Sequence, residues 1–254
     1  MRKAELSRRG LILSAASLGG LTLAGCDRLS RAPSFQSLAG RAEDLSFASQ
    51  RLLLSGQPLA REFSVRDLSP VFKVNGSRLP RDPAYQAMAA NGFSDWKLLV
   101  HGLVARPLSL SLADLRALAA RTQITRHDCV EGWSAIGQWT GVPLGEVLKA
   151  AGLAANARYI VFHCADNLDG QGLYYESIDL FDAFHPQTIL AYAMNGSPLE
   201  IGHGAPLRLR VERQLGYKHA KFVMRVEAAE SLAGFGQGKG GFWEDRGYAW
   251  YAGI

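Results

Sequence analysis

Cysteine is scarce in this sequence, and its scarcity excludes several classes of protein. There are 3 cysteines among 254 residues, and no two of them are spaced as C-x-x-C. A chain of this length with so few cysteines is not a disulfide scaffold, and a closed zinc site would lack its paired ligands. The C-x-x-C-H motif that attaches a c-type haem is missing as well.

Long apolar runs are also missing. The run at residues 11–24 has about 14 residues, which is too short to span a bilayer comfortably. It follows a basic start that contains Arg8 and Arg9, and a basic segment before a short apolar run is typical of a secretory signal. The consecutive arginines resemble a twin-arginine export signal, which carries folded proteins.

The apolar run ends in Leu23-Ala24-Gly25-Cys26, which resembles a bacterial lipobox. We therefore expect residues 1–25 to be removed and Cys26 to be lipidated. Asp27 favours retention on the inner membrane, so the expected location is the periplasm, with the inner membrane as anchor. The alternative is a chance cysteine behind an ordinary signal.

The positive charge of the chain belongs mostly to this leader. The formal net charge is +5, which on its own would suggest a nucleic-acid or membrane-surface partner. Four of the 28 Lys and Arg residues and one of the 23 acidic residues precede Cys26. The chain that follows carries 24 basic and 22 acidic side chains, a net charge of +2. We therefore expect no nucleic-acid partner.

The rest of the chain has the composition of a globular domain, with 48% hydrophobic and 20% charged residues. We expect a tether and an irregular lead-in at 26–70, one domain at 71–233 and a Gly- and aromatic-rich tail at 234–254 that packs on it. Strands and helices mix without strict βαβ alternation, which favours an α+β fold. The expected strands are 96–104, 158–165, 207–212 and 222–227, with a hairpin at Asn195-Gly196, and the expected helices are 110–121, 143–151 and 177–184.

One cysteine, Cys129, lies in a segment rich in functional side chains. Arg126 and His127 precede it, and cationic neighbours lower the pKa of a thiol and favour the thiolate. Three interpretations stay open on these residues alone. Cys129 is a buried structural cysteine, a nucleophile paired with His127, or a lone thiolate ligand to a metal that a cofactor mainly holds.

Three further segments carry polar groups beside glycine or at the end of an expected strand. They are Cys164-Ala-Asp166, His203-Gly-Ala-Pro-Leu-Arg208 and Gly216-Tyr-Lys-His-Ala-Lys221. Backbone amides and cationic side chains of this kind suit an anionic ligand. A disulfide between Cys129 and Cys164 is a further possibility in an oxidising compartment.

Together with Cys129-Val-Glu-Gly-Trp, the last two motifs resemble the molybdopterin-binding domain of the sulfite oxidase family. The resemblance covers about 71–227. It implies a mixed α+β fold, a molybdenum–molybdopterin cofactor and an oxidoreductase that performs oxygen-atom transfer. The family includes the sulfite oxidases and the catalytic subunit of periplasmic methionine sulfoxide reductase.

The resemblance also implies roles for individual residues. Cys129 matches the thiolate ligand of molybdenum, and Tyr174 falls near the tyrosine on the substrate side. His203 matches sulfite oxidases, where the reductase branch has asparagine. The implied cofactor contacts are Asn75, Cys164, Asp166, His203, Arg208, His219, Ala220 and Lys221.

The substrate is left open between a sulfite-like and a sulfoxide-like compound. Sulfite oxidases place arginines after the ligand cysteine, whereas this chain has Val130-Glu131-Gly132-Trp133, closer to the reductase branch. Glu131 would repel a dianion unless paired. Only 27 residues follow Glu227, too few for a dimerisation domain, so we expect a monomer.

Because no covalent haem is encoded, a separate electron partner is expected, either a membrane cytochrome b or a soluble cytochrome c. Two rival functions remain at this stage. One is a cofactor-free envelope lipoprotein that binds or scaffolds, and the other is a cysteine hydrolase.

Overall fold

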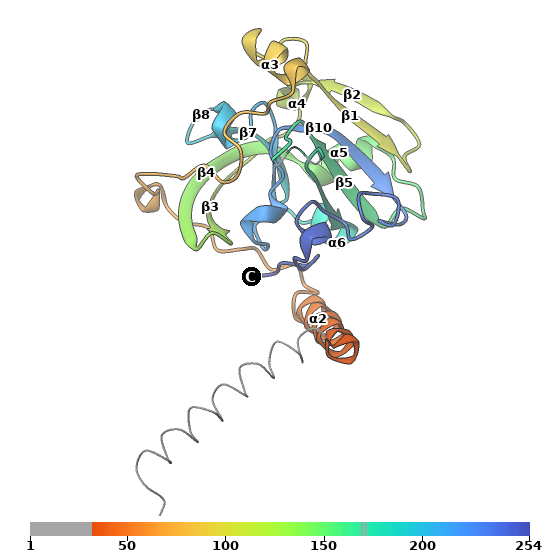
Figure 1. The fold of residues 1–254 in the computed structure, drawn as a ribbon. Coiled ribbons are helices and arrows are strands. Elements are labelled where there is room, and N and C mark those ends of the chain that lie inside the picture. The colour runs from red at the N-terminus through yellow and green to blue at the C-terminus, as the bar shows by residue number, and fades with distance from the viewer. Residues whose placement is uncertain (1–31, 169, 171) are drawn as a thin grey trace, which may run out of the picture. The chain divides into compact units, whose positions relative to one another are not determined.

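The computed structural model describes residues 32–168, 170 and 172–254 (Figure 1). The expected signal segment and Cys26 lie outside these residues. The chain divides into two compact units, Met1–Ser55 and Gly56–Ile254. In the first unit the described element is α2 (Pro33–Leu53), which has a proline in its first turn, where the missing amide is tolerated. Within the described residues no helix is both long and apolar enough to cross a bilayer.

The second unit contains two β-sheets (Figure 1). The first sheet has the order β2-β1-β10-β5-β6, in which only β1 and β10 run parallel. Its strands are β1 (Lys97–Gly102), β2 (Leu108–Ser111), β5 (Tyr159–Cys164), β6 (Tyr175–Asp179) and β10 (Val223–Ala229). This mixed sheet confirms the predicted α+β class.

The second sheet is antiparallel and has the order β3-β4-β7-β8, with β9 paired to β7. Its strands are β3 (Arg121–Cys129), β4 (Trp133–Pro143), β7 (Ile189–Met194), β8 (Ser197–Pro198) and β9 (Arg208–Arg210). The long β3–β4 hairpin ends with Cys129 opposite Trp133, and Gly132 adopts φ +83° in its turn.

Short helices connect and cover the strands. They are α3 (Pro83–Ala90), α4 (Leu112–Ala117), α5 (Leu144–Ala151) and α6 (Leu180–Ala183), with 3₁₀ turns η1 (Val65–Asp67), η2 (Ile201–His203), η3 (Gly216–Lys218) and η4 (Glu244–Arg246). The predicted cap of α4 is present, because the Ser111 hydroxyl accepts from the Asp114 amide in a full capping box. Gly152 ends α5 in the left-handed conformation, also as predicted.

Two predicted helices were too long. The helix expected at 110–121 ends at Ala117, because strand β3 begins at Arg121 and continues the second sheet. The segment expected to be helical at 177–184 begins as strand, since β6 runs to Asp179 and pairs with β5. Only Leu180–Ala183 is helical, where the Asp179 carboxylate accepts from the Asp182 amide at 3.0 Å.

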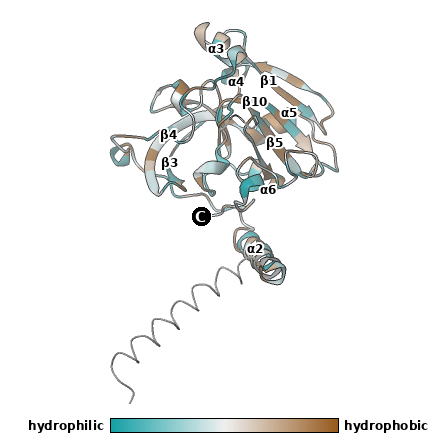
Figure 2. Cartoon of the chain, in the orientation of Figure 1, coloured by the Kyte–Doolittle hydropathy of each residue, from teal (hydrophilic) through white to brown (hydrophobic). Residues whose placement is uncertain are grey.

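The largest apolar core covers the inner face of the first sheet. Alternate residues of β1, such as Leu98 and Val100, are buried, while their neighbours point outward. Val147 and Leu148 of α5 join the same core. Figure 2 shows this alternation as brown and paler patches along β1. The free energy of folding rests mainly on this burial, at roughly 25 cal/mol per Å² of apolar area.

The tail, residues 234–254, is bound to the second unit through specific polar contacts. The Phe242 amide donates to the Tyr175 carbonyl at 2.9 Å, and the Trp250 indole donates to the Ser177 hydroxyl at 2.9 Å. Gly240 adopts φ +95°, and a Cβ there would lie 2.6 Å from the Trp250 ring. The glycines of this segment thus allow its aromatic rings to approach the backbone closely.

A buried charge cluster holds the tail in place. The Lys218 ammonium donates to the carboxylates of Glu176 on β6 and Glu244 on η4, and all three side chains are buried. Burial alone would lower the pKa of Lys218, but the two carboxylates raise it above its ordinary value. Burial, with Glu244 beside it, raises the pKa of Glu176 despite the lysine.

We predict that Lys218→Met lowers the free energy of unfolding at neutral pH by about 3–5 kcal/mol, because it leaves two buried carboxylates without a cation. The loss should shrink as the pH falls, since the Glu176 carboxyl, whose pKa is raised by burial, binds a proton in the folded state at a higher pH than in the unfolded state. Denaturant titration at several pH values measures this. Lys149→Met removes the exposed pair with Glu146 and should change stability by about 0.5 kcal/mol or less. Equal losses in the two variants would contradict the prediction.

Candidate functional site

A cavity of about 160 Å³ lies beside the end of β3. Six of the residues predicted from the sequence line it: Asn75, Cys129, Asp166, Tyr174, His219 and Lys221. The other four, Cys164, His203, Arg208 and Ala220, are not among its lining residues. Chain segments more than 100 residues apart, from Asn75 to Tyr248, thus meet at one place.

Cys129 is the last residue of β3 and faces the cavity from the hairpin turn. Burial raises the pKa of its thiol, and the Glu131 carboxylate adds to this, against the lowering effect of nearby backbone amides. The predicted lowering by cationic neighbours is therefore wrong. Arg126 pairs with Asp128 at 2.9 Å on the exposed side of the strand, and burial keeps the pKa of His127 well below its usual value. A raised pKa is the opposite of what a free nucleophile needs, whereas a coordinated metal deprotonates a thiol by itself.

Cys164 lies behind the cavity, in the main apolar core. Burial raises the pKa of its thiol well above the usual value, and the neighbouring Asp166 carboxylate adds to the effect. Both Cys129 and Cys164 are free thiols, so the disulfide considered from the sequence does not form in this structure.

Asp166 and Tyr174 form one wall of the cavity. Burial raises the pKa of Asp166, and its Oδ1 has no hydrogen-bond partner among the described residues. The Tyr174 hydroxyl donates to the Tyr217 carbonyl at 2.5 Å, and burial raises the pKa of the phenol well above its usual value. Tyr174 therefore presents a neutral, oriented ring to the cavity.

Lys221 fixes the loop that contains Asn75. Its Nζ donates to the carbonyls of Asn75 and Ser77 at 2.6 Å each and of Gly202 at 2.9 Å. An ammonium has three donors, so all of them are engaged. Burial, with Arg208 nearby, lowers the pKa of Lys221 to about 7.

Two buried arginines on β9 differ in their pairing. Both guanidinium groups stack on the Trp139 ring, Arg208 at 4.8 Å and Arg210 at 4.4 Å from its centroid. Arg210 is matched by the Glu212 carboxylate, which accepts two hydrogen bonds from it. Arg208 donates through Nη1 to the His203 carbonyl at 2.9 Å, and its Nε and Nη2 find no partner in the part of the chain that the structure describes. Burial, with Arg210 beside it, lowers the pKa of Arg208 to about 9.

Three histidines, His127, His203 and His219, lie near Arg208 and Arg210. Burial lowers the pKa of each, so they are neutral near pH 7. His219 Nε2 lies 3.0 Å from the Gln214 carbonyl and must carry the proton, which leaves Nδ1 as a buried acceptor without a described partner. His127 Nδ1 accepts from Arg210 at 3.0 Å, so its Nε2 is an unpartnered donor. A Cβ at Gly216 would lie 2.5 Å from that Nε2, so only glycine leaves it this space.

These unpartnered atoms test whether a polar cofactor fits. Each buried polar group left unpaired costs roughly 1–3 kcal/mol, so several near one cavity indicate a missing partner. The donors, on Arg208 and His127, suit an anionic group, and the acceptors, on His219 and Asp166, suit ring N–H groups. A phosphorylated pterin offers both, and the donor set therefore fits the molybdopterin expected from the sequence.

Several residues at the site were not predicted. Arg210 is a buried partner of the predicted residues, and the alternation Arg208-Leu-Arg210 was its only sequence signal. His127 was considered only as a base for Cys129, whereas the structure pairs it with Arg210. Trp243 and Tyr248 of the tail line the cavity, although the sequence indicated only that the tail packs on the domain.

Comparison with known proteins gives a consistent result. Residues 85–233 match the family described as oxidoreductase molybdopterin binding domain. A protein of Azospira oryzae with the provisional name protein-methionine-sulfoxide reductase subunit YedZ1 is 35% identical over 97% of this chain and 88% of its own length. The protein-methionine-sulfoxide reductase catalytic subunit MsrP of Xanthomonas campestris pv. campestris is 32% identical over 89% and 70%. Among solved structures, the sulfane dehydrogenase SoxCD of Paracoccus pantotrophus has a TM-score of 0.49 and 24% identity over 54% of this chain and 39% of its own.

Proposed function

Because this chain belongs to the oxidoreductase molybdopterin-binding domain family, we propose that it is an exported enzyme that reduces sulfoxides by oxygen-atom transfer. The resemblance to the sulfite oxidase family is thereby confirmed, and with it the enzyme class, oxidoreductase, and the cofactor, molybdenum–molybdopterin. The metal in this cofactor supplies the two-electron oxygen-atom transfer when it is bound. The residues of the protein would bind and orient the cofactor and shield it from solvent.

Cys129 is the proposed protein ligand of molybdenum. Its thiol faces the cavity at the end of a strand, and although burial raises its pKa, the backbone amides of Val130 and Glu131 oppose this and would support the thiolate that a bound metal forms. The hairpin register, with Cys129 opposite Trp133, fixes its position. Tyr174 stands across from it as the proposed substrate-side residue.

Most of the remaining predicted residues are proposed to bind the cofactor. The free donors of Arg208 suit a phosphate, to which guanidinium binds through paired hydrogen bonds. His219 and Asp166 are proposed to accept from the pterin ring, and Lys221 positions the Asn75 loop against it. The other three, Cys164, Ala220 and His203, are assigned to the layer behind the cavity wall.

The lining of the cavity favours a neutral sulfoxide over sulfite. Its aromatic and apolar residues include Val130 and Tyr248, which remain 44% and 41% exposed at the surface. Glu131 adds a negative charge, and the ammonium of Lys221 is engaged by backbone carbonyls. A dianion such as sulfite would therefore be repelled by Glu131. A methionine sulfoxide side chain is neutral and suits an aromatic and apolar lining. The names of the two relatives, both protein-methionine-sulfoxide reductases, support the same substrate class.

The electrons are proposed to come from a separate protein. The sequence has no C-x-x-C-H motif for a covalent haem, and both relatives are named as subunits. A membrane cytochrome b or a soluble cytochrome c is the partner we propose for a monomer of this chain. The twin arginines and Cys26 support our proposal that this exchange takes place in the periplasm, at the inner membrane.

We predict that the purified holoenzyme reduces methionine sulfoxide with a reduced dye as electron donor, and that it oxidises sulfite at a rate roughly a hundredfold lower or less, because Glu131 repels the dianion. The turnover rate of Cys129→Ser with methionine sulfoxide should be roughly a hundredfold lower than that of the unchanged enzyme, since the metal loses its thiolate ligand. Dye oxidation measured by absorbance gives both rates.

Arg126→Ala is the matched control, because Arg126 lies on the exposed side of the same strand. It should retain the rate of the unchanged enzyme. Faster turnover of sulfite than of any sulfoxide would overturn the substrate class, and full activity of Cys129→Ser would overturn the ligand.

We also predict that the chain incorporates a fatty acid at Cys26 when it is produced in a bacterium with an envelope lipoprotein pathway. Metabolic labelling with an alkyne fatty acid, followed by gel fluorescence, measures this. Cys26→Ser should lose the label, and Ser30→Ala in the same segment should keep it. A label that persists in Cys26→Ser, or none on the unchanged chain, would contradict the anchor.

A further inference from the structure

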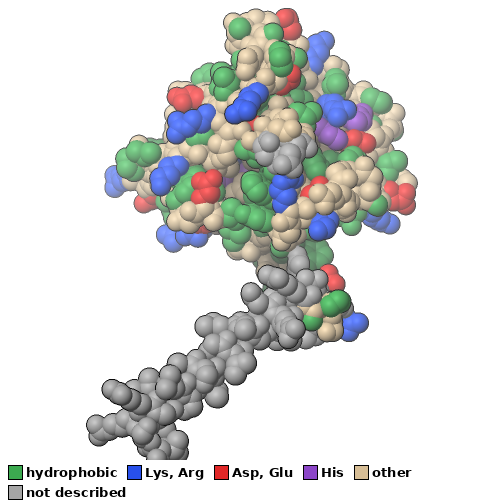
Figure 3. Space-filling model, in the orientation of Figure 1, with side chains coloured by type: hydrophobic (Ala, Val, Ile, Leu, Met, Phe, Trp, Pro, Cys, Tyr) green, Lys and Arg blue, Asp and Glu red, His purple; other side chains and the backbone are tan. Residues whose placement is uncertain are grey.

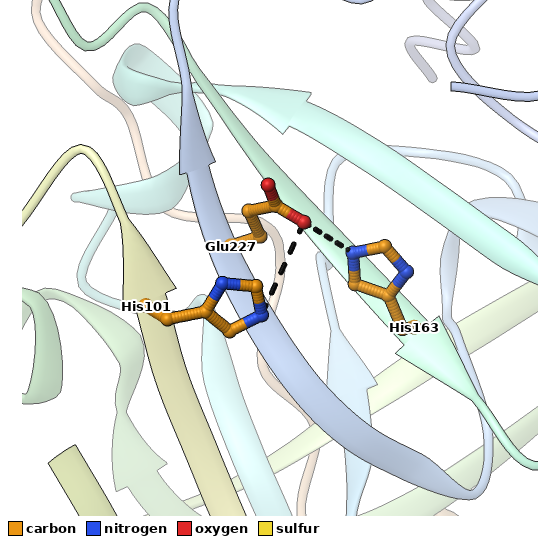
Figure 4. A group of neighbouring side chains, drawn as sticks. All are labelled: His101, His163 and Glu227. Carbon is orange, nitrogen blue, oxygen red and sulfur yellow. Dashed lines mark hydrogen bonds and ion pairs between the residues drawn. The ribbon is translucent and has the colours of Figure 1, made fainter. Parts of the chain in front are cut away.

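Three side chains with metal-binding atoms meet on the first sheet, outside the cofactor cavity. They are His101 on β1, Glu227 on β10 and His163 on β5 (Figure 4). His101 and Glu227 are directly paired across the parallel strands, and His163 is paired with Arg225, two residues from Glu227. Figure 3 shows histidine side chains at the surface where Figure 1 places β1 and β10.

The sheet itself brings these three residues to one face. Val100 and Val226, the neighbours of His101 and Glu227 in sequence, point into the core, so the period of two places His101 and Glu227 outward. His163 likewise follows the buried Phe162. Since the backbone pairing fixes the register, the cluster does not depend on a mobile loop.

The distances between the ligand atoms are close to those of a metal site. Glu227 Oε2 lies 2.8 Å from His163 Nε2 and 4.0 Å from His101 Nε2, and all three atoms lie within 4.8 Å of one another. Zinc bonds of 2.0–2.2 Å at tetrahedral angles require ligand atoms roughly 3.3–3.5 Å apart. Shifts of about 1 Å by these side chains would close the site.

One nitrogen of the cluster is left without a hydrogen bond. His101 Nε2 is buried and has no hydrogen-bond partner among the described residues, although it points toward Glu227. A buried imidazole nitrogen in this state requires an explanation, and a metal ion would supply one. None of the three residues lines the cofactor cavity.

We propose that His101, His163 and Glu227 bind a divalent transition-metal ion, with zinc as the best match, and leave one coordination position open to solvent. Two imidazoles and one carboxylate are a ligand set that zinc uses in sites with an open position. The three side chains remain 33%, 21% and 25% exposed, which leaves a path for the ion and room for a water ligand.

The surrounding charges are compatible with a cation. The Glu227 carboxylate lies between the two imidazoles, 2.8 Å from His163 Nε2 and 4.0 Å from His101 Nε2, and supplies a negative charge to the site. Arg225 is the nearby opposing charge, but its side chain is exposed and screened by solvent. The ion would join β1, β10 and β5, and β5 leads directly to Asp166 in the cofactor cavity.

The test uses untagged holoenzyme, treated with a chelator and dialysed, so that molybdopterin occupies the Cys129 site. Calorimetric titration with Zn²⁺ should show one binding event per chain. Loss of an outer partner of a metal site already costs 10–100-fold in affinity, so His101→Gln or His163→Gln should weaken binding at least about a hundredfold. Glu146→Gln, an exposed carboxylate on α5, is the control and should bind as the unchanged enzyme does.

Two further measurements do not depend on activity. Zn²⁺ should raise the melting temperature of the holoenzyme but not that of His163→Gln, because binding to the folded state alone stabilises it. Co²⁺ should give visible d–d absorption bands that Glu227→Gln changes in position or intensity. Absence of Zn²⁺ binding to the holoenzyme, or equal affinity in the two histidine variants and the control, would overturn the proposal.

Discussion

The burial of the Arg208 guanidinium, to which no carboxylate among the described residues is hydrogen-bonded, is the constraint on which the proposed site depends. Arg210, two residues away on the same strand, is matched by Glu212, so its charge is balanced within the protein. Arg208 contacts the Trp139 ring and the His203 carbonyl, and Glu212, which is hydrogen-bonded to Arg210, acts on it only at longer range. Its burial is unfavourable in the free protein and favourable once an anion arrives. We therefore propose that this unpaired charge preorganises a site for an anion at some cost to the free energy of folding.

The fold keeps this site in place through contacts that connect distant segments. The β3–β4 hairpin places Cys129 at the cavity, Lys221 holds the Asn75 loop by three carbonyl bonds, and the Lys218 cluster attaches the tail. The tail in turn contributes Trp243 and Tyr248 to the lining. Each contact therefore serves both stability and the shape of the site, and damage to any one should affect both.

Local features were predictable from the sequence because their causes are local. The capping box at Ser111, the left-handed Gly152 and the alternating strands depend on neighbouring residues only. Cys129, Asp166, His219 and Lys221 were found through motifs, and they do meet at the cavity. The predicted direction of the Cys129 pKa shift was wrong, because burial raises the pKa, while Arg126 lies on the exposed face of the strand and burial keeps His127 neutral.

Features that depend on contacts between distant segments could not be predicted from the sequence. The strand at the start of the 177–184 segment depends on pairing with β5, and the different pairing of Arg208 and Arg210 depends on where Glu212 and His203 lie. His101, His163 and Glu227 are each more than 60 residues from the next in sequence, and only the sheet register brings them together.

The most direct test of this account is the molybdenum and pterin content of the purified chain and of Arg208→Met. We predict a full complement of both in the unchanged protein and little of either in Arg208→Met. The cofactor-free form of Arg208→Met should be as stable as the cofactor-free parent or more stable, by up to about 4 kcal/mol, since an unpaired buried charge is removed. A full cofactor complement in Arg208→Met, or no molybdenum in the unchanged protein, would contradict the central claim.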